Sequence, residues 1–343
     1  MHAQHRTPYN GRVHVLILGG AGMLGRKLAE ALAATGAIGD RHVERLTLVD
    51  AFATPVAPAG AAFATETLVA DITTPGAAAR LVEERPDVIF HLAAVVSGEA
   101  ETDFDKGYSI NLDGTRDLFD AIRLIGDDYC PRVVFASSIA VFGAPFPDSI
   151  TDDFIQQPLT SYGVQKVIGE LLLTDYSRRG FMDGVGIRLP SICVRPGAAN
   201  KAASGLFSNI IREPLNGRDV VLPASRETRH WFASPRSAMR FLVRAAEIDT
   251  ALLGARRCLN MPGLSATIGE EIEALRAIAG DATVALIHEE PDELIMRIVA
   301  GWPCAFTTTR AHELGFFAES SFEEIIQVYI DDELGGTLGS TPA

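Results

Sequence analysis

Cysteine is scarce in this chain, and its four cysteines have neither the spacing of a disulfide framework nor that of a metal site. Cys130, Cys193, Cys258 and Cys304 stand far apart, with no CxxC pair and no cysteine–histidine cluster. The eight histidines are scattered as well, and no HExxH or similar spacing occurs. The sequence therefore predicts reduced core thiols and no metal site.

Long apolar runs and long basic runs are also missing. No uninterrupted apolar run reaches the about 18 residues of a membrane-spanning helix, and residues 1–11 are polar, without the apolar segment of a signal peptide. We therefore expect a cytoplasmic protein with no membrane partner. The net charge of −14 would repel a nucleic-acid backbone, and no Lys/Arg run offers a local exception, so no nucleic-acid partner is expected.

The remaining composition is that of an ordinary folded protein. Hydrophobic residues make up 47% of the 343 positions and charged residues 22%, which is too apolar for a disordered chain. The length suffices for one large domain or for two closely packed ones. No internal repeat is visible, so the fold class has to come from the order of the segments.

Short β-branched runs alternate with longer helical stretches from Val13 to about Leu189. Pro86 and Pro131 precede two of these runs, as expected where a helix ends. Such alternation predicts parallel strands joined by helices on both faces of a sheet, a Rossmann-type doubly wound α/β fold. The expected strands are Val13–Leu18, Leu46–Asp50, Thr67–Ala70, Val88–Ala93, Arg132–Ala136 and Gly184–Leu189.

The alternation ends after Arg195-Pro196-Gly197, and a loop is expected over Ala198–Ser204. We expect a first domain of residues 12–190 plus 236–262, a smaller discontinuous C-terminal domain of 191–235 plus 263–333, and a flexible tail over 334–343. The remaining expected elements are helices at Leu206–Leu215, Pro235–Ile248, Thr267–Ala279 and Pro291–Val299, and strands at Val220–Leu222 and Cys258–Met261.

Three glycines follow the first apolar run at positions i, i+3 and i+6, in Gly19-Gly20-Ala21-Gly22-Met23-Leu24-Gly25. Because this segment lies between a strand and a helix, it has the form of a dinucleotide-binding turn. The first glycine permits the tight turn, the second lets the backbone approach a pyrophosphate, and the third brings helix against strand. The helix N-terminus would direct unpaired N–H groups toward the phosphates.

Asp50 ends the next apolar run, 25 residues after Gly25. An acidic side chain at this place can accept hydrogen bonds from the ribose hydroxyls of a dinucleotide. A surface loop aspartate is the alternative. The uncharged Ala51-Phe52-Ala53-Thr54 offers no arginine to neutralise a 2′-phosphate, so the sequence predicts NAD rather than NADP as cofactor.

Ser161-Tyr162-Gly163-Val164-Gln165-Lys166 places a tyrosine and a lysine about one helical turn apart. A nearby ammonium favours the tyrosinate, so Lys166 would lower the pKa of Tyr162 and make it a usable general base. A tyrosine packed on a lysine stem is the common alternative for this spacing. The motif follows the fifth apolar run and its serine-containing exit, Ala136–Gly143, which would let a serine hydroxyl meet the phenol.

Together these motifs resemble the extended short-chain dehydrogenase/reductases, a group that includes nucleotide-sugar epimerases. The likeness spans about residues 13 to 265. It implies a catalytic triad of Ser138, Tyr162 and Lys166, with Ser137 as the less favoured serine, and it places the NAD site in the first domain and the substrate site in the second. The cofactor-binding residues that it implies are Gly19, Gly22, Met23, Leu24, Gly25, Asp50, Asp71, Ile72, Leu92, Ala93, Ala94, Asn111, Tyr162, Lys166, Pro190 and Ser191.

Some of these positions keep a structural alternative. Asn111 is either a cofactor contact or a structural polar residue, such as a helix N-cap. Asp71 either lies near the adenine or caps Thr73-Thr74-Pro75. Pro190-Ser191 either backs the nicotinamide carboxamide or forms a plain strand-to-loop turn.

Substrate recognition is expected in the segment Arg229–Arg236, which resembles a family segment whose leading arginine grips an anion. His230 and Arg236 stand where that segment has acidic residues, which puts a sugar-nucleotide substrate in doubt, and Arg236 is expected to be structural. The resemblance of several segments to one group of dehydrogenases implies oxidation of the carbon-2 hydroxyl of a four-carbon sugar acid. Arg229 would hold the carboxylate and Ser97 would contact the polyol, a linker serine being the alternative.

Two other functions stay open. One is a nucleotide-sugar epimerase with the same triad, and the other is a non-catalytic NAD-sensing regulator, since a fold alone does not establish function. An intact triad of Ser138, Tyr162 and Lys166 speaks against the regulator.

The helices expected at Leu112–Leu124 and Tyr162–Tyr176 carry more apolar residues than one buried face needs. Pairing both helices with a second copy would bury the excess, so we expect a homodimer. The residues that suggest this interface are Phe119, Ile122, Val167, Leu171 and Leu172.

Overall fold

The apolar runs of the first part of the chain form one eight-stranded sheet in the computed structural model, which describes residues 11–197 and 204–337. Its strands are β1 (Arg12–Leu18), β2 (Ala37–Ile38), β3 (Arg41–Asp50), β4 (Ala64–Val69), β5 (Val88–His91), β6 (Arg132–Ser138), β7 (Asp183–Leu189) and β11 (Cys258–Asn260). The strand order is β11-β7-β6-β5-β1-β3-β2, and β4 also pairs with β3. The pairs β1–β3, β1–β5, β5–β6 and β3–β4 are parallel, whereas β2 runs antiparallel to β3.

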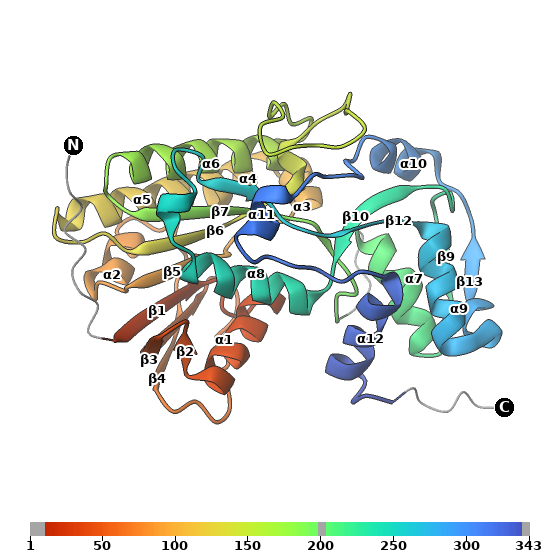
Figure 1. Cartoon of the computed structure of the whole chain (residues 1–343), viewed down its shortest axis with the longest axis horizontal. Coiled ribbons are helices and arrows are strands. Elements are labelled where there is room, and N and C mark those ends of the chain that lie inside the picture. The colour runs from red at the N-terminus through yellow and green to blue at the C-terminus, as the bar shows by residue number, and fades with distance from the viewer. Residues whose placement is uncertain (1–10, 198–203, 338–343) are drawn as a thin grey trace. The chain divides into compact units, whose positions relative to one another are not determined.

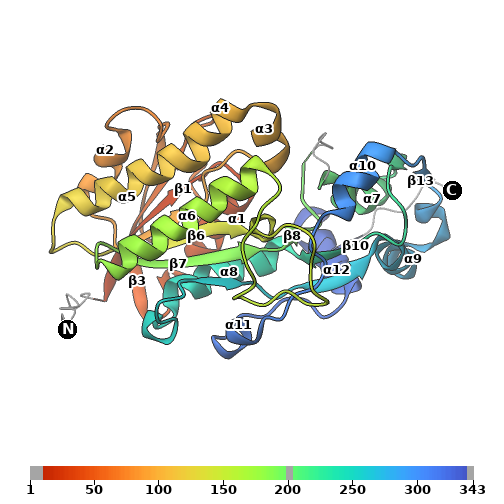
Figure 2. The ribbon, with the colours of Figure 1, turned by 90° about the horizontal axis from the view of Figure 1, so that it is seen from above.

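Helices cover both faces of this sheet, as parallel strands require for their crossovers (Figures 1 and 2). On one face lie α2 (Ala77–Glu83), α5 (Gly114–Ile125) and α6 (Ser161–Arg178). On the other face lie α1 (Met23–Thr35) and the C-terminal part of α8 (Pro235–Glu247). Between β5 and α5 the chain forms α3 (Ser97–Thr102), α4 (Phe104–Gly107) and a π-helical turn (Tyr108–Asp113).

The contacts of the chain group it into two units. The first unit contains the residues up to Val141, Thr160–Arg188 and Met239–Leu259, and the second contains Phe142–Leu159, Leu189–Ala238 and the chain from Asn260 onward. Residues 142–159, which we expected in the first domain, therefore group with the second unit. The assignment of cofactor and substrate to separate domains stays a prediction.

The second unit is built from short strands and five helices in its described part. A three-stranded sheet contains β8 (Ser191–Ile192), β10 (Arg229–Ala233) and β12 (Leu264–Thr267), and β9 (Val220–Leu222) pairs with β13 (Ile287–Glu289). Its helices are α7 (Gly205–Leu215), α9 (Ile268–Val284), α10 (Glu293–Ala300), α11 (Thr309–Glu313) and α12 (Phe322–Glu333). The core of this unit brings together Phe207, Phe232, Ile272, Leu275 and Ile325.

The predicted doubly wound sheet is confirmed. Each of the eight expected strands is present, β9 with the expected bounds and the others with ends shifted by a few residues. The helix expected to end at Ala279 does lose its helical backbone at Gly280, where φ is +79°. The π-helical turn and the short strands β8, β10 and β12 were not expected. The expected loop over Ala198–Ser204 lies almost entirely outside the described residues.

Candidate active site

The glycine turn joins β1 to α1 with the backbone shape that the spacing predicts. Gly19 has a φ of +91°, and a Cβ there would lie 2.9 Å from the backbone nitrogen of Ala93. A Cβ on Gly25 would overlap the carbonyl oxygen of Gly19, so both positions require glycine. Gly22 is exposed, and a Cβ there would meet only the Gly19 carbonyl oxygen, at 3.3 Å. The backbone at Gly22 is therefore open to a close approach by a ligand.

Helix α1 begins directly behind this open position. Gly22 is its N-cap, and no side chain caps the first N–H groups. Met23 and Leu24 are the first two residues of the helix, so their N–H groups have no intrahelical partner. Such a helix start favours an anion through its N–H groups and its partial positive charge. The turn therefore fits the pyrophosphate of a dinucleotide.

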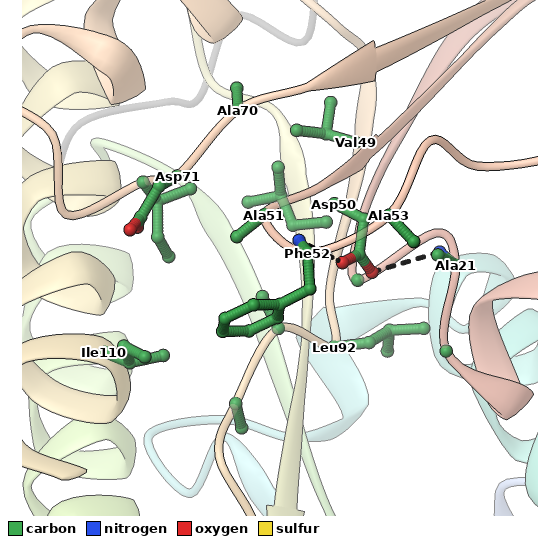
Figure 3. Close-up of a pocket in the computed structure, with 16 residues that line it drawn as sticks. Ala21, Val49, Asp50, Ala51, Phe52, Ala53, Ala70, Asp71, Leu92 and Ile110 are labelled. Atoms are coloured by element: carbon green, nitrogen blue, oxygen red, sulfur yellow. Dashed lines mark hydrogen bonds between the residues drawn. The ribbon is translucent and has the colours of Figure 1, made fainter. Parts of the chain in front are cut away.

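A cavity of about 370 Å³ lies in front of the turn, at the carboxyl ends of β1, β3, β4 and β5 (Figure 3). β1 lies between β3 and β5, so the strand order reverses at β1. Open α/β sheets bind ligands at the carboxyl ends of the strands beside such a reversal. Eight of the expected cofactor residues line it, namely Gly19, Gly22, Asp50, Asp71, Ile72, Leu92, Ala93 and Ala94. The other lining residues are Leu18, Ala21, Val49, Ala51, Phe52, Ala53, Ala70 and Ile110.

Asp50 joins the two loops beside this cavity. Its Oδ2 accepts a hydrogen bond from the N–H of Ala21 at 3.1 Å, and its Oδ1 accepts one from the N–H of Phe52 at 3.0 Å (Figure 3). The side chain is half-buried and lines the cavity, which distinguishes it from an ordinary surface loop aspartate. A contact between Asp50 and a ribose stays a prediction.

Asp71 shows the capping arrangement and lines the cavity as well. Its Oδ1 accepts hydrogen bonds from the N–H of Thr73 at 2.9 Å and from the Thr73 hydroxyl at 2.8 Å. The neighbouring Ile72 is buried in the cavity wall. The two alternatives for Asp71 are therefore compatible with one another, and the cofactor contact stays a prediction.

Asn111 lies in the middle of the π-helical turn, so the N-cap alternative is wrong. Its Oδ1 accepts a hydrogen bond from the N–H of Val95 at 2.9 Å, and its Nδ2 donates to Oε1 of Gln165 at 2.7 Å. Both amide atoms of this buried side chain are thus bonded within the protein. Asn111 connects the loop after β5 to α6, which is the structural one of its two expected roles.

The expected triad assembles where β6 meets α6. Ser138, the last residue of β6, lies beside the phenol of Tyr162 and lowers its pKa through hydrogen bonding. The ammonium of Lys166 donates to the carbonyl oxygen of Ala136 at 2.9 Å and lies 4.8 Å from the centre of the Phe135 ring. The same ammonium lies 5.6 Å from the centre of the Tyr162 ring. The three expected catalytic side chains are therefore adjacent.

Ser137 is directed away from the phenol. Its hydroxyl donates to Glu170 at 2.5 Å, and both residues are buried. Glu170 also forms a buried ion pair with Arg188 of β7, at 2.8 Å. The sequence reasoning missed Glu170, although its position one turn after Lys166 on the same helix was a signal. Ser138 is accordingly the serine that meets Tyr162.

The protonation of the triad differs from the expectation. Burial raises the pKa of Tyr162 to about 12, and the hydrogen bond with Ser138 opposes this rise. The expected lowering of the Tyr162 pKa by Lys166 is wrong for this arrangement, because the ammonium is directed at Ala136 and the Phe135 ring. Burial lowers the pKa of Lys166 to about 8, and the nearby Glu170 carboxylate partly opposes this decrease.

The expected residues of the second unit form two separate groups. Arg229 begins β10 with 41% of its side chain exposed, and it pairs with Glu270 at 3.2 Å. Ser191 of β8 lies 2.6 Å from Nε2 of the buried His230, and Pro190 before it is buried. Arg229 is thus engaged by a carboxylate in this structure, and a substrate contact stays a prediction for it.

Two further expectations concern Ser97 and Arg236. Ser97 begins α3 in the first unit and is half-buried, with nothing in its surroundings that distinguishes a polyol contact from a linker serine. Arg236 pairs with Asp332 of α12 at 2.5 Å, which is the structural role expected for it.

In the described ranges no group of three or more His, Cys, Asp or Glu side chains is arranged to hold a metal ion. Across those same ranges, no helix has the length and apolar character needed to cross a membrane. None of the four cysteines, all of which lie in the described ranges, forms a disulfide, and Cys193 and Cys258 are buried as expected. Cys130 is exposed, so the expectation of a core thiol is wrong there.

The NAD dependent epimerase/dehydratase family matches residues 15–250. The chain belongs to this family, and NAD is its cofactor. Among its relatives, the D-erythronate dehydrogenase of Cupriavidus necator is 46% identical over 93% of this chain and 98% of its own length. The D-erythronate dehydrogenase of Haemophilus influenzae is 39% identical, over 93% of this chain and 99% of its own length.

Solved structures of similar proteins carry a different description. A structure described as a nucleoside-diphosphate-sugar epimerase from Agrobacterium tumefaciens is 61% identical, with a TM-score of 0.94 over 98% of this chain and 99% of that one. An L-threonine dehydrogenase from Clostridium difficile shares the fold, with a TM-score of 0.80 at 21% identity over 95% of this chain and 99% of that one.

Proposed function

We propose that this protein oxidises the carbon-2 hydroxyl of D-erythronate to 2-oxo-D-erythronate with NAD, as one step of sugar-acid catabolism. The observation that carries the proposal is the near full-length identity to two D-erythronate dehydrogenases. The adjacent Ser138, Tyr162 and Lys166 supply the groups that such an oxidation needs. The chain is then an NAD-dependent oxidoreductase that acts on a CH–OH group.

In this mechanism Tyr162 is the general base. Its phenolate oxygen takes the proton from the carbon-2 hydroxyl, and the Ser138 hydroxyl donates a hydrogen bond that holds the reacting oxygen. NAD, when bound, supplies the hydride acceptor and the positive charge of its nicotinamide ring. The ammonium of Lys166 lies beside the Tyr162 ring and donates to the Ala136 carbonyl oxygen, and the nearby Glu170 carboxylate favours its charged form.

In this proposal the cofactor is held mainly through the first unit, and also through Pro190 and Ser191, which group with the second unit. The backbone of the glycine turn and the N-terminus of α1 bind the pyrophosphate. The Asp50 carboxylate accepts from the adenosine ribose, and the walls of the adenine site include Asp71 and Ile72. Further contacts that we propose come from Leu92, Ala93, Ala94, Lys166, Pro190 and Ser191.

The substrate carboxylate requires a cation, and we propose Arg229 for it. A guanidinium presents two parallel donors that match a carboxylate. The present partner of Arg229 is Glu270, an exposed residue of the first turn of α9, so the sugar acid would have to replace or share that contact. Ser97 remains the proposed contact for the polyol hydroxyls.

The test is a comparison of substrates with purified protein. NADH appearance is followed with erythronate, threonate, longer aldonates, threonine and UDP-sugars side by side. We expect the highest kcat/KM with D-erythronate, and no NADH from UDP-sugars. Activity with none of the sugar acids would contradict the proposal.

A nucleotide-sugar epimerase is the second candidate, favoured by the description of the Agrobacterium tumefaciens structure. An epimerase would convert a UDP-sugar without net NADH and would carry bound NAD through purification. Analysis of the sugar products and of NAD in the purified protein separates the two functions. A non-catalytic NAD-sensing regulator would show neither activity.

In each case we propose a homodimer in the cytoplasm.

A further inference from the structure

An exposed aromatic side chain lines the dinucleotide cavity. Phe52 belongs to the loop after β3, and 76% of its surface is exposed although it forms part of the cavity wall. Figure 3 shows its side chain projecting into the space between Asp71, Ile110 and Leu92. A large apolar ring left in water at the wall of a cavity is typical of a surface that a ligand covers.

A lysine from another segment of the first unit lies over this ring. The ammonium of Lys106, in α4, is 5.3 Å from the centre of the Phe52 ring, within the range of a cation–π contact. Glu99 of α3 holds the same ammonium at 2.5 Å, and Asp103 accepts the backbone N–H of Lys106 at 3.1 Å. The cation that covers the ring is therefore anchored to both α3 and α4.

The backbone of Phe52 is tied to the cofactor turn. Asp50 accepts the N–H of Phe52 through one carboxylate oxygen and the N–H of Ala21 through the other. In doubly wound sheets, an acidic side chain at this place binds the adenosine ribose. Phe52 and Lys106 are thus located at the adenosine end of the cavity.

We propose that Phe52 and Lys106 form a clasp over the adenosine end of the bound dinucleotide, which slows its release. The ring stacks on the adenine, because every base offers a π-face to an aromatic side chain. Lys106 keeps the ring in this position through the cation–π contact. The proposal rests on NAD being the cofactor and does not depend on which substrate is oxidised.

The test measures binding to the full chain without turnover. NADH release is followed by its fluorescence in a stopped-flow instrument, and ADP-ribose binding is measured by competition. Phe52→Ala is expected to raise both dissociation constants about tenfold, mainly through faster release. Phe52→Tyr keeps the ring and is expected to stay within about twofold of the wild type. Lys106→Met is expected to speed NADH release about threefold.

Phe104 provides a matched control. It is another exposed aromatic residue, on α4, and its ring is tilted against that of Tyr108 with 4.4 Å between the ring centres. It is not among the residues that line the cavity. Phe104→Ala is expected to leave the binding of both ligands unchanged. The proposal is overturned if Phe52→Ala changes NADH release by less than about twofold. Tighter NADH binding by Phe52→Ala would also overturn it, because the ring would then obstruct the site. Failure of sugar-acid oxidation would leave these binding results intact, so the two proposals fail separately.

Discussion

Tyr162 is the residue on which the proposed chemistry depends most directly. Tyr162→Phe removes the phenol oxygen but keeps the ring, so NADH binding should persist while kcat falls by about 10² to 10⁴. Tyr176→Phe, on the same helix, is the control, because that hydroxyl bonds Asp120 outside the triad. Steady-state kinetics with chemistry rate-limiting checks this. A variant that keeps more than about a tenth of the wild-type kcat would place the base elsewhere.

The protonation of the same residue predicts a pH profile. Because burial raises the pKa of Tyr162 to about 12, the base is protonated in the free enzyme at neutral pH. The kcat/KM for oxidation reports the groups of the free enzyme, so it is expected to rise with pH from about 7 to about 10. Initial rates measured across this pH range give the kcat/KM profile. A flat profile would mean that another group takes the proton.

Arg229 can be tested by comparing a charged with an uncharged substrate. The carboxylate of a sugar acid stays charged throughout the reaction, so Arg229→Gln should raise KM by about tenfold or more and leave kcat nearly unchanged. The KM and kcat for the uncharged lactone or polyol should be unaffected by this substitution. Arg236→Gln, which loses the ion pairs with Asp331 and Asp332 of α12, is the control. Equal losses for acid and lactone would make Arg229 a structural residue.

At the scale of elements, helix α9 contains a carboxylate without a partner. Glu271 in its first turn is fully buried, and neither of its carboxylate oxygens has a hydrogen-bond partner. Burial therefore raises its pKa well above the ordinary value. The native state binds this proton more tightly than the unfolded chain does. The free energy of unfolding is therefore fully retained below the pKa of Glu271 in the unfolded chain, and it declines as the pH rises toward the pKa of Glu271 in the folded protein.

This linkage predicts how a neutral replacement behaves. Glu271→Gln should raise Tm at pH about 8, by about 2–4 °C for each 1 kcal/mol gained in the free energy of unfolding. The gain should vanish near pH 4, where Glu271 is protonated in both states. Glu270→Gln is the matched control, because that exposed neighbour forms the capping box with Thr267 and should lower Tm slightly. Thermal unfolding at both pH values measures the difference. An equal effect of Glu271→Gln at both pH values would contradict a buried protonated carboxyl.

At the scale of the whole molecule, the homodimer is the main untested expectation. Two of the residues that suggested it are unsuitable, since Phe119 and Ile122 are fully buried in the core of the first unit. Leu171 on α6 and Leu124 on α5 are 60% and 71% exposed, so both helices still present apolar surface. A self-complementary pairing of α5 and α6 would bury it.

Light scattering at micromolar concentration is expected to give twice the chain mass of 36.7 kDa. The double substitution Leu124→Glu with Leu171→Glu should yield the monomer, because it places four charges in the interface of a dimer. Leu294→Glu, at an exposed leucine of α10, is the control and should leave the mass unchanged. A wild-type mass of 36.7 kDa would exclude this dimer.

The sheet, the glycine turn and the YxxxK helix could be predicted from the sequence alone. These features are encoded in contiguous stretches, where periodicity, glycine spacing and a tyrosine one turn from a lysine each have a local physical meaning. The six strands of the alternating segment were therefore predictable before any contact was known, and eight of the sixteen residues that line the cavity were among the expected cofactor residues.

The partners of individual side chains, by contrast, depend on the folded structure. Ser137 and Ser138 are neighbours of the same type, and their partners on α6 distinguish them. Ser137 donates to the buried Glu170, further along the helix, whereas Ser138 lies beside the Tyr162 phenol near the start of the helix. The side-chain amide of Asn111 likewise forms hydrogen bonds with Val95 and Gln165, which are distant in sequence. The pKa of Tyr162 and the exposure of Phe52 beside the cavity depend on burial, and strands β8, β10 and β12 depend on long-range pairing. Local sequence patterns do not contain this information, because the packing partners come from other parts of the chain.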